Sequence, residues 1–311
     1  MPDEPIILVV GSINMDLAVR VAHLPDPGET VLGHSFQSSG GGKGANQAVA
    51  VARLGGRCRL IGRVGHDAFG GQLLEGLEAE GIDCRCLHAI EEAPTGVAVI
   101  VVNARGENSI VVAGGANHRL TPDDVFSCED AFTGAAAVLL QLELPLPTVR
   151  AAIDVARRCG CKVILDPAPA LRDMPRELYR VDVLSPNTNE AEVLTGAKAI
   201  EERLDKQVAS ELIARGAAAT VLKLGPRGCL AAMADGHFYT VPTYDVPVVD
   251  STAAGDAFTG ALGLALARGQ NLHQAAKFAN AAGALTCTRL GAQSAMPTAQ
   301  EVALLMKDQP I

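Results

Sequence analysis

The chain has 311 residues, of which 48% are apolar and 20% are charged, with a formal net charge of -9. This composition is typical of a globular protein with a buried core and excludes a disordered or fibrous chain. The negative charge and the aromatic content of only 3% argue against nucleic acid as a partner, because phosphates are repelled and few rings can stack on bases.

Membrane insertion and export are not expected either. No apolar run reaches the roughly 18 residues that span a bilayer, and the N-terminus lacks the pattern of a signal peptide. The eight cysteines show no CxxC spacing, which favours free thiols in a reducing compartment. We therefore expect a cytoplasmic protein without a membrane partner.

The strand pattern predicts an α/β fold with a doubly wound, mostly parallel sheet. Continuous apolar runs, typical of strands buried on both faces, occupy residues 6–10, 136–142, 162–165, 181–184 and 220–224. Helical patterns between several of these runs indicate βαβ units. Ligands bind at the carboxyl ends of such strands, which gives weight to Asn14, Glu143, Asp166, Asn187 and Gly225.

Two further stretches predict a separate, small antiparallel sheet. Residues 16–21 with 30–36, and residues 97–102 with 108–112, have the pattern of short paired strands that no helix interrupts. This sheet would cover the binding edge of the main sheet as a lid. The expected division is an α/β core at residues 1–14, 37–95 and 113–311, and a discontinuous lid at residues 15–36 and 96–112.

A first glycine-rich segment, SSGGGKGAN at residues 38–46, precedes an expected helix at residues 45–54. It is not a Walker A loop, because Gln37 stands in place of the first glycine and Gly44 in place of the Ser or Thr. A backbone without side chains lets a small ligand approach closely, and Lys43 and Asn46 offer hydrogen-bond donors to hydroxyl groups. A flexible turn before a packed helix is the alternative.

A second segment, DSTAAGDAF at residues 250–258, is expected to run from a strand into a helix. Free backbone N–H groups of Ala254, Gly255 and Asp256 would bind an anion there, such as a transferring phosphoryl group. Asp256 would accept the proton of an attacking hydroxyl group, and we expect its pKa to be low. An Asp that merely favours the first turn of its helix is the alternative.

These two segments, together with NTNE at residues 187–190 and Glu143, resemble the ribokinase family of carbohydrate kinases over essentially the whole chain. The resemblance implies ATP-dependent phosphorylation of D-ribose at its 5-hydroxyl group, with Asp256 as the base, and a homodimer formed through the lid. The implied partners are D-ribose and ATP. A deoxyribokinase or another sugar or nucleoside kinase of this family is the first alternative, and a catalytically silent sugar sensor is the second.

The resemblance also implies the residues of each site. The catalytic segment would be Ala253, Ala254, Gly255 and Asp256. The sugar would be bound by Asn14, Asp16, Gly42, Lys43, Asn46, Glu143 and Asp256. The nucleotide would be bound by Asn187, Lys223, Gly225, Gly228, Gly255 and Asn280.

Two metal ions are implied as well. Glu190 would hold Mg²⁺ through water, because this ion usually keeps several of its waters. A capping box formed by Asn187 and Glu190 is the alternative interpretation of that motif. K⁺ would bind as an activator, mostly through backbone carbonyl groups, at Asp250, Thr252, Thr286, Arg289, Gly291 and Ala295. The family commonly has Ser at the last of these positions, so one hydroxyl ligand is absent here.

Overall fold

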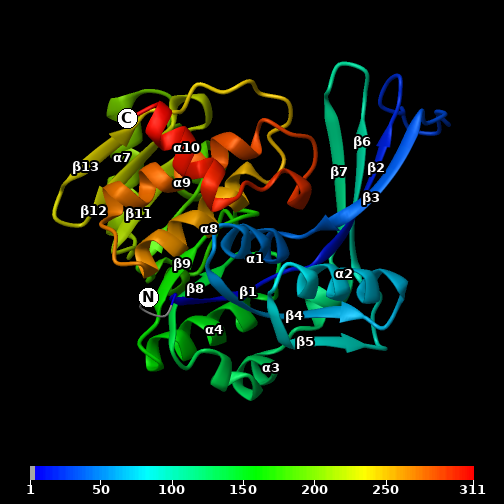
Figure 1. Ribbon diagram of the computed structural model, residues 1–311, viewed down its shortest axis with the longest axis horizontal. Coiled ribbons are helices and arrows are strands. Elements are labelled where there is room, and N and C mark those ends of the chain that lie inside the picture. Colours follow the sequence, from blue (N-terminus) through cyan, green and yellow to red (C-terminus); the bar gives the residue numbers. More distant parts are fainter. Residues whose placement is uncertain (1–3) are drawn as a thin grey trace.

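The computed structural model describes residues 4–311 and contains a large sheet between helices and a small sheet beside it (Figure 1). Across these residues the large sheet has nine strands in the order β13-β12-β11-β10-β9-β8-β1-β4-β5. All neighbours from β11 to β5 pair in parallel, whereas β12 and β13 continue the sheet as antiparallel strands. The predicted doubly wound, mostly parallel fold is confirmed. The strands are β1 (Ile6–Val10), β4 (Arg57–Gly65), β5 (Asp83–Ile90), β8 (Ala135–Leu140), β9 (Lys162–Leu165), β10 (Val183–Leu184), β11 (Ala219–Lys223), β12 (Cys229–Met233) and β13 (Phe238–Val241).

Helices cover both faces of the large sheet, which is why its central strands are apolar throughout. Ile7 and Val9 of β1 pack into one core, with α1, α2, α8 and α9, while Leu8 and Val10 pack into the other, with α3, α4, α6 and α7. The helices are α1 (Lys43–Arg53), α2 (Ala68–Ala79), α3 (Pro122–Ser127), α4 (Leu146–Arg158), α5 (Arg176–Tyr179), α6 (Thr188–Thr195), α7 (Glu202–Ala214), α8 (Ala254–Ala267), α9 (Leu272–Thr286) and α10 (Ala299–Asp308). Short 3₁₀ turns are η1 (Gly115–Arg119), η2 (Glu129–Ala131), η3 (Gly225–Arg227) and η4 (Gln293–Ala295).

The small sheet projects from the core (Figure 1) and shares no described strand with the large sheet, as predicted. Its order is β3-β2-β6-β7, in which the antiparallel hairpins β2–β3 and β6–β7 join through the parallel pair of β2 and β6. The strands are β2 (Asn14–Arg20), β3 (Ser35–Gly41), β6 (Gly96–Val102) and β7 (Asn108–Ala113). The strand expected at residues 30–36 lies at 35–41 instead, because prolines and Gly28, with a φ of 86°, keep the preceding segment in a loop.

One expected strand is absent from the described structure. Residues 242–253, between β13 and α8, form a loop, so α8 does not follow a strand directly. Pro242 and Pro247 lack the N–H group that a strand needs to continue its ladder. Within residues 4–311, every helix is too short or too polar to cross a lipid bilayer.

Candidate active site

Glycines bring the N-terminus of α1 against the end of β1. Gly42 has a φ of 86°, and a Cβ at this position would lie 2.7 Å from the backbone nitrogen of Asn14. A Cβ on Gly44 would lie 2.5 Å from the carbonyl carbon of Gly11. Only glycine permits both the backbone conformation of Gly42 and these close approaches. The turn is therefore tightly packed, not a flexible connection.

Glu143 and Ser12 receive the first N–H groups of α1. The backbone of Lys43 donates to Oε2 of Glu143 at 3.3 Å, and the backbone of Ala45 donates to the carbonyl oxygen of Ser12 at 3.0 Å. The hydroxyl group of Ser12 also donates to the same Oε2, at 2.5 Å. A carboxylate at this position suits the positive end of the helix dipole. The second oxygen of Glu143 remains available to a ligand.

Asn14 and Asp16 lie at the base of the small sheet. Oδ1 of Asn14 accepts a hydrogen bond of 2.8 Å from Asn117, a buried side chain in η1 that sequence reasoning missed. The carboxyl group of Asp16 lies over Gly41, where a Cβ would come within 2.2 Å of it. Burial, followed by the charges of Glu143 and Asp256, raises the pKa of Asp16 to about 7.

Asp256 is buried in the first turn of α8 and faces α1. Its Oδ2 accepts a hydrogen bond of 2.9 Å from Asn46, whose own Oδ1 is buried without a hydrogen-bond partner among the described residues. Burial raises the pKa of Asp256 to about 6; Lys43 opposes the shift, while Asp166 and Glu143 add to it. The expectation of a low pKa was wrong, because Asp256 is buried, with only 5% of the residue exposed.

Lys43 supplies positive charge to this group of carboxylates. Although its burial opposes ionisation, Asp256, Asp166, Glu143 and Glu190 together raise the pKa of Lys43 above its ordinary value. The ammonium group is therefore charged at neutral pH. It can donate hydrogen bonds to ligand hydroxyl groups from within the site.

The N-terminus of α8 offers fewer free donors than the sequence suggested. The N–H group of Ala254 donates to the carbonyl oxygen of Ser251 at 3.2 Å, because Ala253 has a left-handed backbone with a φ of 59° and turns the chain back. The N–H groups of Gly255 and Asp256 have no protein acceptor among the described residues. Together with the helix dipole, these two groups can bind an anion.

A buried polar network that sequence reasoning did not assign connects the two halves of the site. Asp166, at the end of β9, accepts hydrogen bonds from Lys223 at 2.8 Å, from Thr259 at 3.2 Å and from Gln47 at 3.3 Å. Gln47 also lies 3.5 Å from Oδ1 of Asp256. The available signals were the polar Gln47, directly after Asn46 in α1, and the position of Asp166 at a strand end.

Several proposed nucleotide ligands converge beside β11. Gly228 has a φ of 83°, and a Cβ on it would lie 2.0 Å from the carbonyl oxygen of Val241. Asn280 of α9 donates to the neighbouring carbonyl oxygen of Pro242 at 2.6 Å. Gly225 has a φ of 59°, and a Cβ on it would meet no other atom within 4 Å. Lys223, the last residue of β11, reaches toward α8, where a Cβ on Gly255 would lie 3.5 Å from its ammonium nitrogen.

The capping interaction of Asn187 and Glu190 is formed. The backbone and the side chain of Asn187 each donate to Glu190 at 2.7 Å, and Asn187 accepts from the backbone of Glu190 at 2.9 Å. Burial raises the pKa of Glu190, which Lys223 opposes. Each carboxylate oxygen still has a lone pair for a water ligand, so capping and Mg²⁺ binding through water are compatible.

The residues proposed for K⁺ come from two loops that hydrogen bonds hold together. Gly291 donates to Oδ2 of Asp250 at 2.9 Å, and Val249 donates to the carbonyl oxygen of Cys287 at 2.8 Å. Although burial opposes it, the hydrogen bonds from Gly291 and Thr252 lower the pKa of Asp250. Among the described residues, no cluster of three or more His, Cys, Asp or Glu side chains could hold a metal. The remaining residues proposed for K⁺ are Thr286, Arg289 and Ala295. The side chain of Arg289 pairs with Glu301, and Ala295 is buried.

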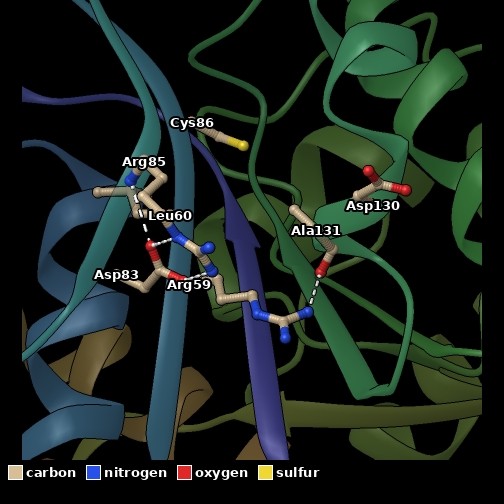
Figure 2. A pocket seen from close by; sticks show the side chains of 7 residues that line it. All are labelled: Arg59, Leu60, Asp83, Arg85, Cys86, Asp130 and Ala131. Atoms are coloured by element: carbon tan, nitrogen blue, oxygen red, sulfur yellow. Dashed lines mark hydrogen bonds and ion pairs between the residues drawn. The ribbon is translucent and has the colours of Figure 1, made fainter.

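Two cavities are lined by other residues than those described above. The first, of about 230 Å³, is lined by Arg59, Asp83, Arg85 and Cys86, near the amino ends of β4 and β5 (Figure 2). Its arginines are engaged, since Arg85 pairs with Asp83 and Arg59 donates to the carbonyl oxygen of Ala131 (Figure 2). The second, of about 260 Å³, lies between α7 and β12. Parallel sheets bind ligands at the opposite edge from the first cavity.

Comparison with known proteins identifies the family. The pfkB family of carbohydrate kinases matches residues 5–299. A ribokinase from Haemophilus influenzae is 38% identical over 293 residues, which are 94% of this chain and 95% of that protein. A deoxyribokinase from Salmonella typhi is 34% identical over 296 residues, which are 95% of this chain and 96% of that protein. The structure of Arabidopsis thaliana ribokinase complexed with ribose and ATP has a TM-score of 0.90 and 33% identity, covering 97% of this chain and 99% of that chain. The chain therefore belongs to the pfkB family of carbohydrate kinases.

Proposed function

We propose that the protein is a ribokinase, which transfers the terminal phosphoryl group of ATP to the 5-hydroxyl group of D-ribose. One observation carries the proposal: the buried carboxyl group of Asp256 lies at the N-terminus of α8, beside two free N–H groups and opposite the amide of Asn46. A base and an anion site are thus adjacent. Relatives named ribokinase, at 38% identity over nearly the whole chain, support this choice of substrate.

In the proposed reaction, Asp256 orients the 5-hydroxyl group and accepts its proton as the new bond between oxygen and phosphorus forms. The bond between that phosphorus and the bridging oxygen of ATP breaks, and ADP leaves. The N–H groups of Gly255 and Asp256 stabilise the charge on the transferring group. With a pKa of about 6, Asp256 is ionised at neutral pH and is a stronger base than an exposed carboxylate.

The polar side chains around Asp256 are suited to a sugar with several hydroxyl groups. Oδ1 of Asn46 is a buried acceptor that lacks a partner among the described residues, and leaving it unpaired is costly. A sugar hydroxyl group would satisfy it. Asn14, Asp16, Gly42, Lys43 and Glu143 would complete the sugar site.

The nucleotide would lie along the ends of β10 and β11, bound by Asn187, Lys223, Gly225, Gly228, Gly255 and Asn280. Mg²⁺ held by Glu190 through water would neutralise phosphate charge.

We also propose K⁺ as an activator at Asp250, Thr252, Thr286, Arg289, Gly291 and Ala295. Replacing K⁺ by tetramethylammonium should lower the rate, and an unchanged rate would contradict this site.

We propose that the small sheet is a lid that also forms a homodimer. Large apolar side chains are exposed on it, among them Phe36 at 65% and Val111 at 67%. A second copy would bury them. Val111→Glu should convert a dimer into a monomer in sedimentation experiments, and a monomeric wild type would contradict the proposal.

The eight free cysteines support a reducing location, the cytoplasm.

The test is an ADP-release assay with D-ribose, 2-deoxyribose or no sugar, with the product identified by mass spectrometry. We expect turnover with ribose, and much slower turnover with deoxyribose, because polar groups that bind the 2-hydroxyl group would lose their partner. Equal rates would favour the deoxyribokinase alternative, which the 34% identical relative keeps open. Ribose binding without turnover would favour a sugar sensor.

A further inference from the structure

The turn between β11 and β12, residues 224–228, carries two of the glycines proposed to bind the nucleotide. The turn closes on itself, since the N–H group of Leu224 donates to the carbonyl oxygen of Gly228 at 2.8 Å and Gly228 donates to that of Gly225 at 2.9 Å. On one side it touches the end of β13, where a Cβ on Gly228 would meet the carbonyl oxygen of Val241. On that side no space remains for the turn to move.

On its other side the turn faces the second cavity. Leu224 and Arg227 line this space of about 260 Å³, together with Ile200 and Leu230. Side chains do not fill it completely, so packing alone supports the turn weakly here. What holds the turn on this side is a set of directed contacts from Arg227.

Arg227 is fixed to the beginning of α7 by three hydrogen bonds. Its Nη1 lies 2.5 Å from Oδ2 of Asp205, its Nη2 lies 3.1 Å from Oδ1 of the same carboxylate, and Nη2 also donates to the carbonyl oxygen of Ala199 at 2.7 Å. Two parallel bonds to one carboxylate fix the orientation of a guanidinium group as well as its distance. Asp205 is only 2% exposed, so removing its partner would leave a buried, unpaired charge.

We propose that Asp205 and Arg227 are positioning residues that hold the turn at residues 224–228 in the conformation that binds ATP. The role rests on the proposed function, because it needs a nucleotide at this turn. Arg227 lies between the two glycines, so a shift of its guanidinium group would move both, whereas the sugar side chains lie on other elements. Loss of the pair should therefore weaken ATP binding selectively.

The experiment compares Asp205→Asn and Arg227→Gln with the wild type in ATP binding by calorimetry and in the separate KM values for ATP and ribose. Asn keeps the shape of Asp205 but loses the charge and one of the parallel bonds. Arg227 is 39% exposed, so Arg227→Gln leaves no buried cavity, and a thermal melt checks that the variant folds although Asp205 loses its charged partner. Glu211→Gln is the control, because it breaks a pair with Arg215 near the other end of α7.

We expect the Kd and the KM for ATP to rise about tenfold in both variants, with the KM for ribose and kcat close to wild type. The control should leave ATP binding unchanged. ATP affinity that stays at the wild-type value, or KM values that rise equally for both substrates, would overturn the positioning role while the proposed function stands. A wild-type chain that binds no ATP would overturn both. If Asp205→Asn does not fold, Arg227→Gln decides alone.

Discussion

Replacing Asp256 with Asn should stabilise the protein at neutral pH while it removes activity. Burial is the main cause that raises the pKa of Asp256 from 3.8 to about 6. A carboxyl group with a raised pKa binds its proton more tightly in the folded state, so its contribution to stability is complete below pH 3.8 and is lost as the pH rises through 6. A shift of about two pKa units corresponds to roughly 3 kcal/mol at pH 8. Asn resembles the protonated form and avoids this cost.

Thermal melts of both proteins at pH 8 and pH 5 measure the effect. The melting temperature of Asp256→Asn should be higher by roughly 5–10 °C at pH 8, and the difference should be about half as large at pH 5, where wild-type Asp256 is mostly protonated. Asp154→Asn, on the exposed face of α4, controls for the loss of one negative charge. The kcat of Asp256→Asn should fall by several orders of magnitude. A variant that is no more stable than the wild type at pH 8 would refute the reasoning.

Three further predictions concern the same site. The kcat/KM for ribose should fall about tenfold per pH unit below pH 6, because protonated Asp256 cannot accept a proton; a flat profile to pH 5 would contradict its role as base. Glu143→Gln should move this acid limb to lower pH, since the charge of Glu143 raises the pKa values of Asp16 and Asp256; pH-rate profiles of the variant check the direction. Gly42→Ala should cost about 2 kcal/mol or more in stability, measured by melting, because its φ is 86° and the new Cβ would meet backbone; an unchanged melting temperature would contradict this.

The positions of the strand-end residues could be predicted from the sequence, because parallel strands place their carboxyl ends at one edge. Asn14 and Glu143 follow that rule. Glu143 lies at the N-terminal end of α1, and Asn14 lies at the base of the small sheet. The small sheet was predictable from its short strand-like stretches, which no helix interrupts. The shifted position of β3 was not, because proline and glycine in residues 25–28 outweighed the apolar residues that follow them.

The electrostatics of Asp256 could not be predicted from the sequence. Its neighbours in the chain are small and uncharged, which suggested an ordinary, ionised carboxylate at a helix N-terminus. The charges that affect it belong to Lys43, Asp166 and Glu143, which lie at least 90 residues away in the chain. Burial at the contact between α1 and α8 depends equally on tertiary packing. A sequence pattern can place a catalytic residue on its element, but it does not reveal the dielectric around that residue.

The same excess of negative charge bears on the need for cations in the proposed reaction. Five carboxyl groups lie in and around the site, at Asp16, Glu143, Asp166, Glu190 and Asp256, against the ammonium groups of Lys43 and Lys223. Burial is the main cause of the raised pKa values of Asp16 and Asp256, and the neighbouring carboxylates add to it. An ATP molecule would bring further negative charge to the same edge, and two N–H groups at the tip of α8 are too few to balance it. A divalent cation that enters with the nucleotide reduces this repulsion, so the electrostatics of the side chains themselves favour a reaction in which ATP binds as its Mg²⁺ complex.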